Sequence, residues 1–392
     1  CYGHRRNTSP MIDRLAEEGI IFERAISQSS WTLPSHVSML TGFYPIEHGC
    51  NVVQGITLSN KVTTLAEYLL EAGYHTMAVT SSHFVSPIYN LDQGFEDFSY
   101  NQSTADRLIR VAVSRIDKNA RRPFFMFLHL FDPHDPYTPP EEFRRKFVKD
   151  HELKSVDGYV DHMIAKHGQL TYGSRELDIL ERLYDAEINF ADDQLGFLLQ
   201  RLWRANILDN TIVIVTSDHG EEFFEHGWSG HSVVLFDESL RIPLIFHGPT
   251  VEAGKVVSQT SDMTVIVPMI LAHTGLPDPL KRGAPVLGTG AYGHTNGFGN
   301  HRTSWRHDGW SFLTEVDFTY GERRRQFPPG LYDDPSEQTN LIEQNAEKVQ
   351  EMQDEMDQSL GAQIKKYGKM KTGTTDLDET RLNRLRELGY VQ

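Results

Sequence analysis

The chain has few cysteines, a deficit of basic residues and no long apolar run. Of 392 residues only Cys1 and Cys50 are cysteines, which excludes a disulfide framework and leaves a single bridge open. No stretch approaches the roughly 20 apolar residues that a membrane-spanning helix needs. The 38 lysines and arginines are outnumbered by 54 aspartates and glutamates, and the net charge of −16 repels phosphate backbones. We therefore expect neither nucleic acid nor a membrane surface as a partner, and no membrane span.

What is present is the composition of an ordinary globular protein, with 39% hydrophobic and 23% charged residues. Apolar runs of strand length, such as Met77–Val79, Pro123–Leu130 and Thr211–Ser217, contain few polar residues, which is typical of strands covered on both faces. Glu176–Trp203 carries leucines at helical spacing. This alternation predicts an α/β fold with a mostly parallel, doubly wound sheet sandwiched by helices.

Several further elements and a division into two domains follow from the same patterns. Ser9-Pro10 is typical of a helix start. The other expected strands are Ile20–Ala25, Ile242–His247 and Trp310–Asp317, and the other expected helices are Pro34–Gly42, Thr64–Ala72 and Asn340–Tyr367. Gly275–Gly290 is rich in glycine and proline and is interpreted as a connector. We predict a catalytic domain over 1–290 and a smaller C-terminal α+β domain with a helical tail over 291–392.

The most informative local pattern is the stretch TLPSH at 32–36, which continues to LTG at 40–42. Thr32 is expected just ahead of a helix that begins at Pro34, where free backbone N–H groups and the positive helix end favour an anion. A threonine hydroxyl at this place can bind a metal ion and attack an electrophilic phosphorus or sulfur atom. The alternative is that Thr32 only caps the helix, as threonine commonly does.

Other polar residues follow the apolar runs. Asp218 and His219 come directly after the run at 211–217, where one oxygen and one nitrogen can reach the same cation; a simple polar turn is the alternative. Further histidines at such positions are His83, His134, His226 and His231. A lone histidine is usually a surface or core residue. Because ligands of α/β sheets gather at the carboxyl ends of strands, several imidazoles there can steady an anion or protonate its leaving group.

Together these stretches resemble the sulfatase family of the alkaline-phosphatase superfamily. The resemblance is carried by residues 1–16, 32–42, 48–49, 132–137, 218–221, 241–244 and 331–341. It implies a large α/β sandwich with a small antiparallel C-terminal domain, and hydrolysis of a small anionic ester with one divalent metal ion. Its implied catalytic residues are Thr32, His36, His83, His134 and His231, and its implied metal ligands are Asp218, His219 and Thr32.

One departure from the family decides the expected chemistry. Sulfatases carry Cys or Ser at the position of Thr32 and oxidise it to formylglycine. Oxidation of a threonine would give a ketone, so no formylglycine is expected, and a threonine alkoxide favours attack on phosphorus. The family's arginine is His36 here, and its two lysines fall at Ser81 and His231. The pocket should therefore be less cationic and suit a singly charged diester better than a doubly charged monoester.

The metal site is expected to draw on residues outside the printed chain. The family binds its ion through two aspartates of a first strand, which would lie just upstream of Cys1, and Asp218 and His219 match the later pair. We therefore expect the first strand to be missing upstream of Cys1. A histidine ligand favours zinc or manganese, with calcium as the alternative, since calcium prefers oxygen ligands.

The sequence thus predicts a metal-dependent ester hydrolase that cleaves phosphate diesters, phosphonate esters or phosphate monoesters through Thr32. Two rival interpretations stay open: a sulfatase that acts without formylglycine, and a sulfatase-like binding domain without catalysis. The variable segment 150–173 is expected to contact the organic part of the substrate. No pattern in the sequence indicates an oligomeric state or a compartment.

Overall fold

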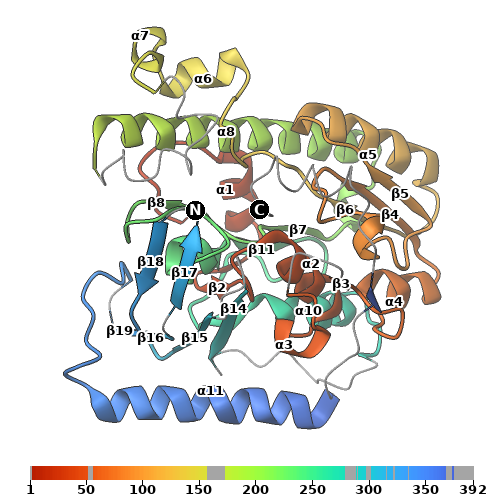
Figure 1. Cartoon of the computed structure of the whole chain (residues 1–392). Coiled ribbons are helices and arrows are strands. Elements are labelled where there is room, and N and C mark those ends of the chain that lie inside the picture. The colour runs from red at the N-terminus through yellow and green to blue at the C-terminus, as the bar shows by residue number, and fades with distance from the viewer. Residues whose placement is uncertain are drawn as a thin grey trace.

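The structure is a computed structural model, and it describes residues 2–51, 56–156, 173–278, 288, 290–296, 302–314, 316–320, 323–333, 335–367 and 373–374. Two sheets stand in the middle of the molecule with helices on both faces (Figure 1). The α/β class predicted from the sequence is confirmed by this arrangement. In the described part of the chain, no helix combines the length and the apolar character that crossing a membrane requires.

The first sheet is parallel and has the order β5–β4–β6. Its strands are β4 (His75–Thr80), β5 (Asp97–Tyr100) and β6 (Phe124–Leu128). The helix before β4, α4 (Leu65–Glu71), begins where predicted. The Thr64 hydroxyl accepts the N–H of Glu67, and the Glu67 carboxylate accepts the N–H of Thr64.

The second sheet has the order β12–β1–β11–β7 and is mixed. Its strands are β1 (Ile20–Phe22), β7 (Val213–Thr216), β11 (Leu244–His247) and β12 (Lys255–Val257). β1 and β12 are parallel, whereas β11 is antiparallel to both β1 and β7. The expected parallel arrangement does not extend to β11, because the connection from β7 contains no helix long enough for a crossover and the chain returns beside the strand it left.

Helices cover both faces of these sheets. On one face lie α1 (Pro10–Glu17), α5 (Ala105–Asn119) and α8 (Arg175–Arg204), whose apolar side chains pack against β4, β6, β7 and β11. On the other face α2 (Thr32–Thr41), α4 and α10 (Ile266–His273) pack against β1, β11 and β12. This confirms the predicted doubly wound sandwich.

Two runs predicted as single strands are each divided. The run at 20–25 becomes β1 and β2 (Ala25–Ile26), and β2 joins a small sheet of order β10–β2–β13. The run at 310–317 becomes β16 (Trp310–Leu313) and β17 (Val316–Tyr320). The short strands of the small sheet are β10 (Arg241–Ile242) and β13 (Ser261–Asp262). In the runs at 20–25 and 310–317 the sequence stays largely apolar, but the chain leaves one sheet and pairs with strands of another.

An antiparallel sheet of order β14–β15–β16–β19 follows later in the chain. It comprises β14 (Ala291–Thr295), β15 (Arg302–His307), β16 and β19 (Gly330–Tyr332), and α11 (Ala346–Tyr367) lies along it (Figure 1). Met352, Met356 and Leu360 of α11 pack on rings of this sheet. The predicted domain boundary at 290 adjoins residues outside the described part and stays a prediction.

The remaining elements are short apart from one hairpin. They are α3 (Pro45–His48), α6 (Glu141–Phe147), α7 (Asp150–Leu153), α9 (Asp237–Leu240), η1 (Pro87–Tyr89), η2 (Leu208–Asn210), η3 (Met263–Val265), β3 (Ile56–Thr57), β8 (Glu222–Phe223), β9 (Ser229–Gly230), β18 (Arg323–Phe327), which pairs with β17, and β20 (Gly373–Thr374). Cys50 is buried and free, while Cys1 lies outside the described residues. Residues 157–172 of the predicted substrate-contacting segment lie outside them too.

A deep groove separates the two central sheets. It has a volume of about 1630 Å³ and is lined by residues 123–134 on the β6 side and 210–221 on the β7 side. Both strands are edges of their sheets among the described residues. Their side chains are only half-buried, unlike those of β4, because one edge of each strand faces the groove. Both faces of β6 and β7 are nevertheless packed against helices, as expected.

Candidate active site

Thr32 is the first residue of α2, is only 5% exposed and lines the groove. Trp31, in an extended conformation, occupies the position before the helix, and its side chain makes no capping hydrogen bond. The alternative that Thr32 caps the helix from outside therefore does not hold. Pro34 is the third helical residue rather than the first. Thr32 thus lies in the first turn, where the helix dipole favours a negative charge.

Asp218 follows β7 and is tied to the start of α2. Its backbone carbonyl accepts hydrogen bonds from the hydroxyls of Ser27 and Ser35. Its carboxylate oxygen Oδ2 lies 3.4 Å from His36 Nδ1 and 3.4 Å from His219 Nε2. Burial raises the pKa of Asp218, but the surrounding imidazoles, His219 and His36 first, hold that pKa well below its usual range. Asp218 is therefore an anion at neutral pH.

His219 presents a lone pair to this carboxylate. Its Nδ1 lies 2.9 Å from the carbonyl oxygen of Gly220, so Nδ1 carries the proton and donates. Burial lowers the pKa of His219 to about 4, so the ring is neutral and Nε2 carries the lone pair. Two acceptors, Nε2 and Asp218 Oδ2, then face each other at 3.4 Å. A cation between them would remove this repulsion, so the pair fits a divalent metal ion with one nitrogen and one oxygen ligand.

His36 and His129 line the groove together with Thr32. His36 Nδ1 donates to the Thr32 carbonyl oxygen at 2.8 Å, which fixes the ring. The ring of His129 lies 4.9 Å from that of His36, and its Nδ1 accepts the N–H of Ser81 at 3.3 Å. Burial lowers the pKa of His129 to about 3. Sequence reasoning missed His129, although it follows the apolar run of β6 as the other histidines follow theirs.

His134 and His231 join the cluster from the β6 side and from the segment after β9. The rings of His134 and His231 are 5.0 Å apart, and His231 stacks on His219 at 4.3 Å. Burial lowers the pKa of His134, but hydrogen bonds to Asp135 outweigh this effect and raise the pKa to about 9. His231 Nδ1 lies 3.1 Å from Glu221 Oε1. Asp135 and Glu221 were not predicted, although Asp135 directly follows His134 in the sequence; the contact of Glu221 with His231 spans ten residues and forms only in the folded chain.

The other two histidines of the sequence pattern lie elsewhere. His83 packs among the rings of Phe84, Tyr89 and Tyr100, with ring centres 6.0, 5.7 and 6.5 Å away. Its neighbour Ser82 lines the groove, and the predicted catalytic role of His83 stays a prediction. His226 lies in a second cluster with two glutamates.

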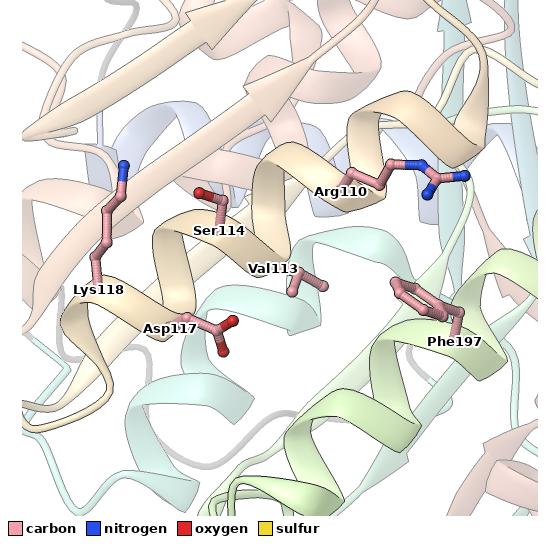
Figure 2. Close-up of a pocket in the computed structure, with 6 residues that line it drawn as sticks. All are labelled: Arg110, Val113, Ser114, Asp117, Lys118 and Phe197. Atoms are coloured by element: carbon pink, nitrogen blue, oxygen red, sulfur yellow. The ribbon is translucent and has the colours of Figure 1, made fainter.

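A shallower hollow of about 400 Å³ lies between α5 and α8 (Figure 2). Its lining residues are Arg110, Val113, Ser114, Asp117, Lys118 and Phe197. This lining contains no histidine or cysteine and a single carboxylate, whose ion-pair partner is Arg201 of α8. The chemistry of the molecule therefore points to the groove at Thr32 and Asp218.

Comparison with known proteins identifies the family of the chain. Residues 1–276 match the family model described as Sulfatase. The chain belongs to the sulfatase family. This sulfatase-family chain is 26% identical over 331 residues to the uncharacterized sulfatase YidJ of Escherichia coli, a match that covers 71% of this chain and 65% of that protein. It is 25% identical over 315 residues to human iduronate 2-sulfatase, covering 64% of this chain and 57% of that protein.

Solved structures of the family share the fold. A putative sulfatase from Bacteroides thetaiotaomicron superposes with a TM-score of 0.74 at 17% identity, covering 97% of this chain and 92% of that one. The phosphonate monoester hydrolase of Agrobacterium radiobacter superposes with a TM-score of 0.71 at 18% identity, covering 92% of each chain. The sulfatase-family chain spans 57–65% of the length of the two curated relatives above.

Proposed function

We propose that the protein is a metal-dependent hydrolase of phosphorus esters, either phosphate diesters, phosphonate esters or phosphate monoesters, with Thr32 as the nucleophile. The observation that carries this proposal is the arrangement around Asp218. An anionic carboxylate and a neutral histidine lone pair meet beside the groove that Thr32 lines. Ser35 hydrogen-bonds to Asp218 and so ties the helix of Thr32 to this pair. A solved structure of the same fold is named as a phosphonate monoester hydrolase.

Asp218 Oδ2, His219 Nε2 and the Thr32 hydroxyl are the groups of this chain that would hold the metal ion. A divalent ion bound there polarises the ester and lowers the pKa of a bound hydroxyl. The mixed nitrogen and oxygen donors favour zinc or manganese, with calcium as the alternative. No formylglycine is required, because a threonine hydroxyl is itself a nucleophile once its proton is lost.

The histidines supply the proton transfers of the proposed reaction. His36, fixed by its bond to the Thr32 carbonyl, carries its proton on Nδ1 and has a free Nε2 in its neutral form, so we assign it the role of orienting and activating Thr32. The Thr32 hydroxyl gives its proton to His36 Nε2 as its oxygen bonds to phosphorus, and the bond to the leaving alcohol breaks. His134, which carries a proton at neutral pH, donates it to that alcohol. Water then releases the phosphoryl group from Thr32.

The groove supports a further part of this proposal, namely that a strand preceding Cys1 lies between β6 and β7. Both strands are edges, and Tyr2, His4 and Arg6 line the same groove. The Tyr2 hydroxyl accepts the N–H of Leu244 at 2.9 Å, and Leu244 pairs with the last residue of β7. Residues just before Tyr2 would thus arrive beside Asp218, where the remaining carboxylate ligands are expected.

A sulfatase that acts without formylglycine is the second candidate, because several relatives are named as sulfatases. The deciding experiment measures hydrolysis of nitrophenyl esters by a chain that carries its natural residues upstream of Cys1, with manganese, zinc or calcium supplied. The substrates are a phosphate monoester, a phosphate diester, a phosphonate ester and a sulfate ester. Preference for a phosphorus ester is expected. Preference for the sulfate ester would overturn the substrate assignment, and no turnover with any metal would favour a binding domain.

A further inference from the structure

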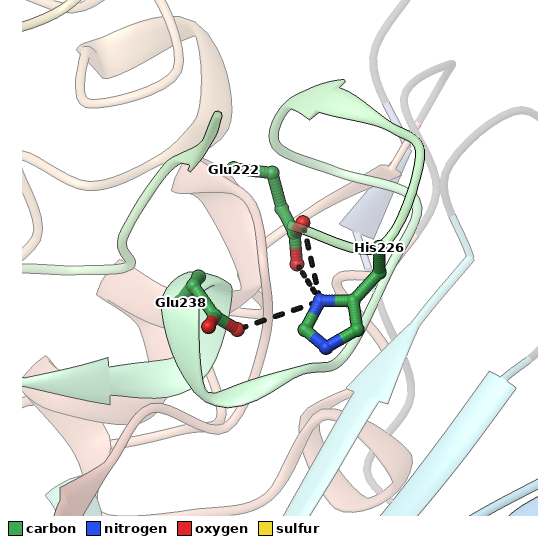
Figure 3. Close-up of side chains that lie close together, drawn as sticks. All are labelled: Glu222, His226 and Glu238. Carbon is green, nitrogen blue, oxygen red and sulfur yellow. Dashed lines mark hydrogen bonds and ion pairs between the residues drawn. The ribbon is translucent and has the colours of Figure 1, made fainter. Parts of the chain in front are cut away.

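Glu222, His226 and Glu238 form a second cluster of potential metal ligands. Glu222 lies in β8, His226 in the turn between β8 and β9, and Glu238 in α9. Figure 3 shows both carboxylates directed at the same edge of the imidazole. One ligand atom of each residue lies within 4.8 Å of the other two. His226 Nδ1 is 3.3 Å from Glu222 Oε1 and 3.6 Å from Glu238 Oε2.

The orientation of the imidazole is fixed from its far side. His226 Nε2 lies 3.2 Å from the carbonyl oxygen of Ser336 and donates to it. The amide nitrogen of Gln338 is also 3.2 Å from Nε2, but its two hydrogens have acceptors in the carbonyls of Glu225 and Ser336. The ring of Phe236 stacks on the imidazole at 3.6 Å. The neutral ring therefore points the Nδ1 lone pair at the two glutamates, as metal-binding histidines do.

Burial disfavours the ionised form of both carboxyl groups in this cluster: it raises the pKa of Glu222 well above its usual range and that of Glu238 to about 8. Glu222 is completely buried, and the Oε2 atom of Glu238 is shielded from solvent and has no hydrogen-bond partner within the described chain. Because a buried charge without compensation is costly, a divalent cation is the simplest complement to two carboxylates and a neutral imidazole.

Of the two neighbouring arginines, Arg306 is paired with other carboxylates, whereas the positive charge of Arg302 lowers the pKa of Glu222 but does not offset the effect of burial. Arg306 donates to Asp237 at 2.6 Å and to Glu337 at 3.1 Å. The Arg302 guanidinium lies over the ring of Phe236, 5.3 Å from its centre. The aromatic ring thus lies against both Arg302 and His226.

We propose that Glu222, His226 Nδ1 and Glu238 bind a structural divalent cation of the zinc class, separate from the ion at Asp218. Such an ion would join the β8–β9 turn to α9. Both elements belong to the segment that carries Asp218, His219, Glu221 and His231. The Gly220 N–H donates to the Ser239 carbonyl at 2.9 Å within the same segment. The cation would therefore hold in place the loop that supplies the active-site histidines. This inference does not depend on the proposed ester hydrolysis.

The test is zinc binding by the full chain, measured as bound equivalents after equilibrium dialysis against Zn²⁺ alone. We expect Glu238→Gln and His226→Gln each to lower the affinity of one zinc equivalent by at least ~10- to 100-fold. The Asp218→Asn variant should keep that equivalent. Glu225→Gln is the matched control, because Glu225 lies on the same turn and accepts the Phe223 N–H instead of facing His226 Nδ1.

A thermal melt of each variant with and without zinc shows whether a loss reflects misfolding. We expect zinc to raise the unfolding midpoint of the unmodified chain, of Asp218→Asn and of Glu225→Gln, and to raise the midpoint of Glu238→Gln by less than that of Glu225→Gln, because only the Asp218 site is left to bind zinc. Cobalt provides a second readout, since its visible absorption reports the ligand set, and the Glu222 site should give a band that His226→Gln removes. Equal zinc binding by the unmodified chain, Glu238→Gln and His226→Gln, or none by any of them, would overturn the proposal.

Discussion

The Asp218 cluster and the Glu222 cluster lie on the same stretch of chain, yet they have opposite charge balance. Around Asp218 several imidazoles surround one carboxylate, and they hold its pKa low. Around His226 two carboxylates surround one imidazole, and burial raises the pKa of Glu238 to about 8. The first cluster opens to the groove, and Glu238 of the second lines that groove too, although Glu222 is completely buried. The charge balance, together with Thr32 beside the first cluster, thus distinguishes a candidate catalytic centre from a candidate structural one.

Removing the proposed nucleophile should have the largest effect on turnover, and it tests whether the reaction takes place at the Asp218 cluster. We expect Thr32→Ala to lower turnover of the preferred nitrophenyl ester by on the order of 10⁴-fold or more, since no other hydroxyl would replace it. Stopped assays of the chain with its natural upstream residues would measure this. Thr32→Ser, which keeps a hydroxyl, is the control and should retain much more activity. Substantial turnover by Thr32→Ala would remove Thr32 from the mechanism.

Neutralising Asp218 should separate the two clusters. We expect Asp218→Asn to lower turnover by about 10³-fold, because charge stabilisation by a bound ion is worth several kcal/mol. The same variant should lose the zinc equivalent of the groove and keep that of the Glu222 cluster. Dialysis and turnover measured on one preparation would test this. Simultaneous loss of both equivalents would mean that the two clusters form one site.

The proton on His134 sets an upper pH limit for turnover at the Asp218 cluster. Its pKa in the folded protein, about 9, exceeds the unperturbed 6.5, so the imidazole keeps its proton at neutral pH and loses it as the pH rises through about 9. We expect turnover with a poor leaving group to fall above pH 9. His134→Gln should lower turnover by ~10²-fold and abolish this limb of the profile. An unchanged limb in His134→Gln would assign it to another group.

The smallest expected effect concerns the link between the clusters. A Cβ on Gly220 would lie 2.0 Å from the carbonyl oxygen of Glu238, so Gly220→Ala must push α9 away from the loop. We expect a loss of about 1–3 kcal/mol in the free energy of unfolding, measured by urea denaturation. Gly361→Ala in α11 is the control, because nothing lies within 4 Å of its added Cβ. A Gly220→Ala variant as stable as this control would show that α9 adjusts without strain.

Local signals in the sequence predicted the elements that depend on local interactions. The helix at 176–203 is present as α8, and the capping residues Thr64 and Glu67 place α4 correctly. The strand divisions at 20–25 and 310–317 were not predicted, because the change of partner strand is decided by distant segments. The same holds for β11, whose antiparallel pairing depends on the route of the chain after β7.

The sequence pointed to most residues of the candidate site but to few of their partners. The structure brings six predicted residues into one connected group, Thr32, His36, Asp218, His219, His134 and His231, while their catalytic and metal-binding roles stay predictions. His129 was missed although it carries the same signal as the others. The Glu222 cluster was also missed, because Glu222, His226 and Glu238 approach one another only when α9 folds against the β8–β9 turn.

The groove between β6 and β7 has a consequence for handling the protein. Without the strand proposed upstream of Cys1, two strand edges that face the groove present backbone groups to any extended peptide of suitable length, including one from a neighbouring copy. We expect a preparation that lacks this strand to self-associate as its concentration rises. A short peptide that pairs with these strand edges would compete with self-association. The solubility of the preparation would therefore report whether the groove is filled.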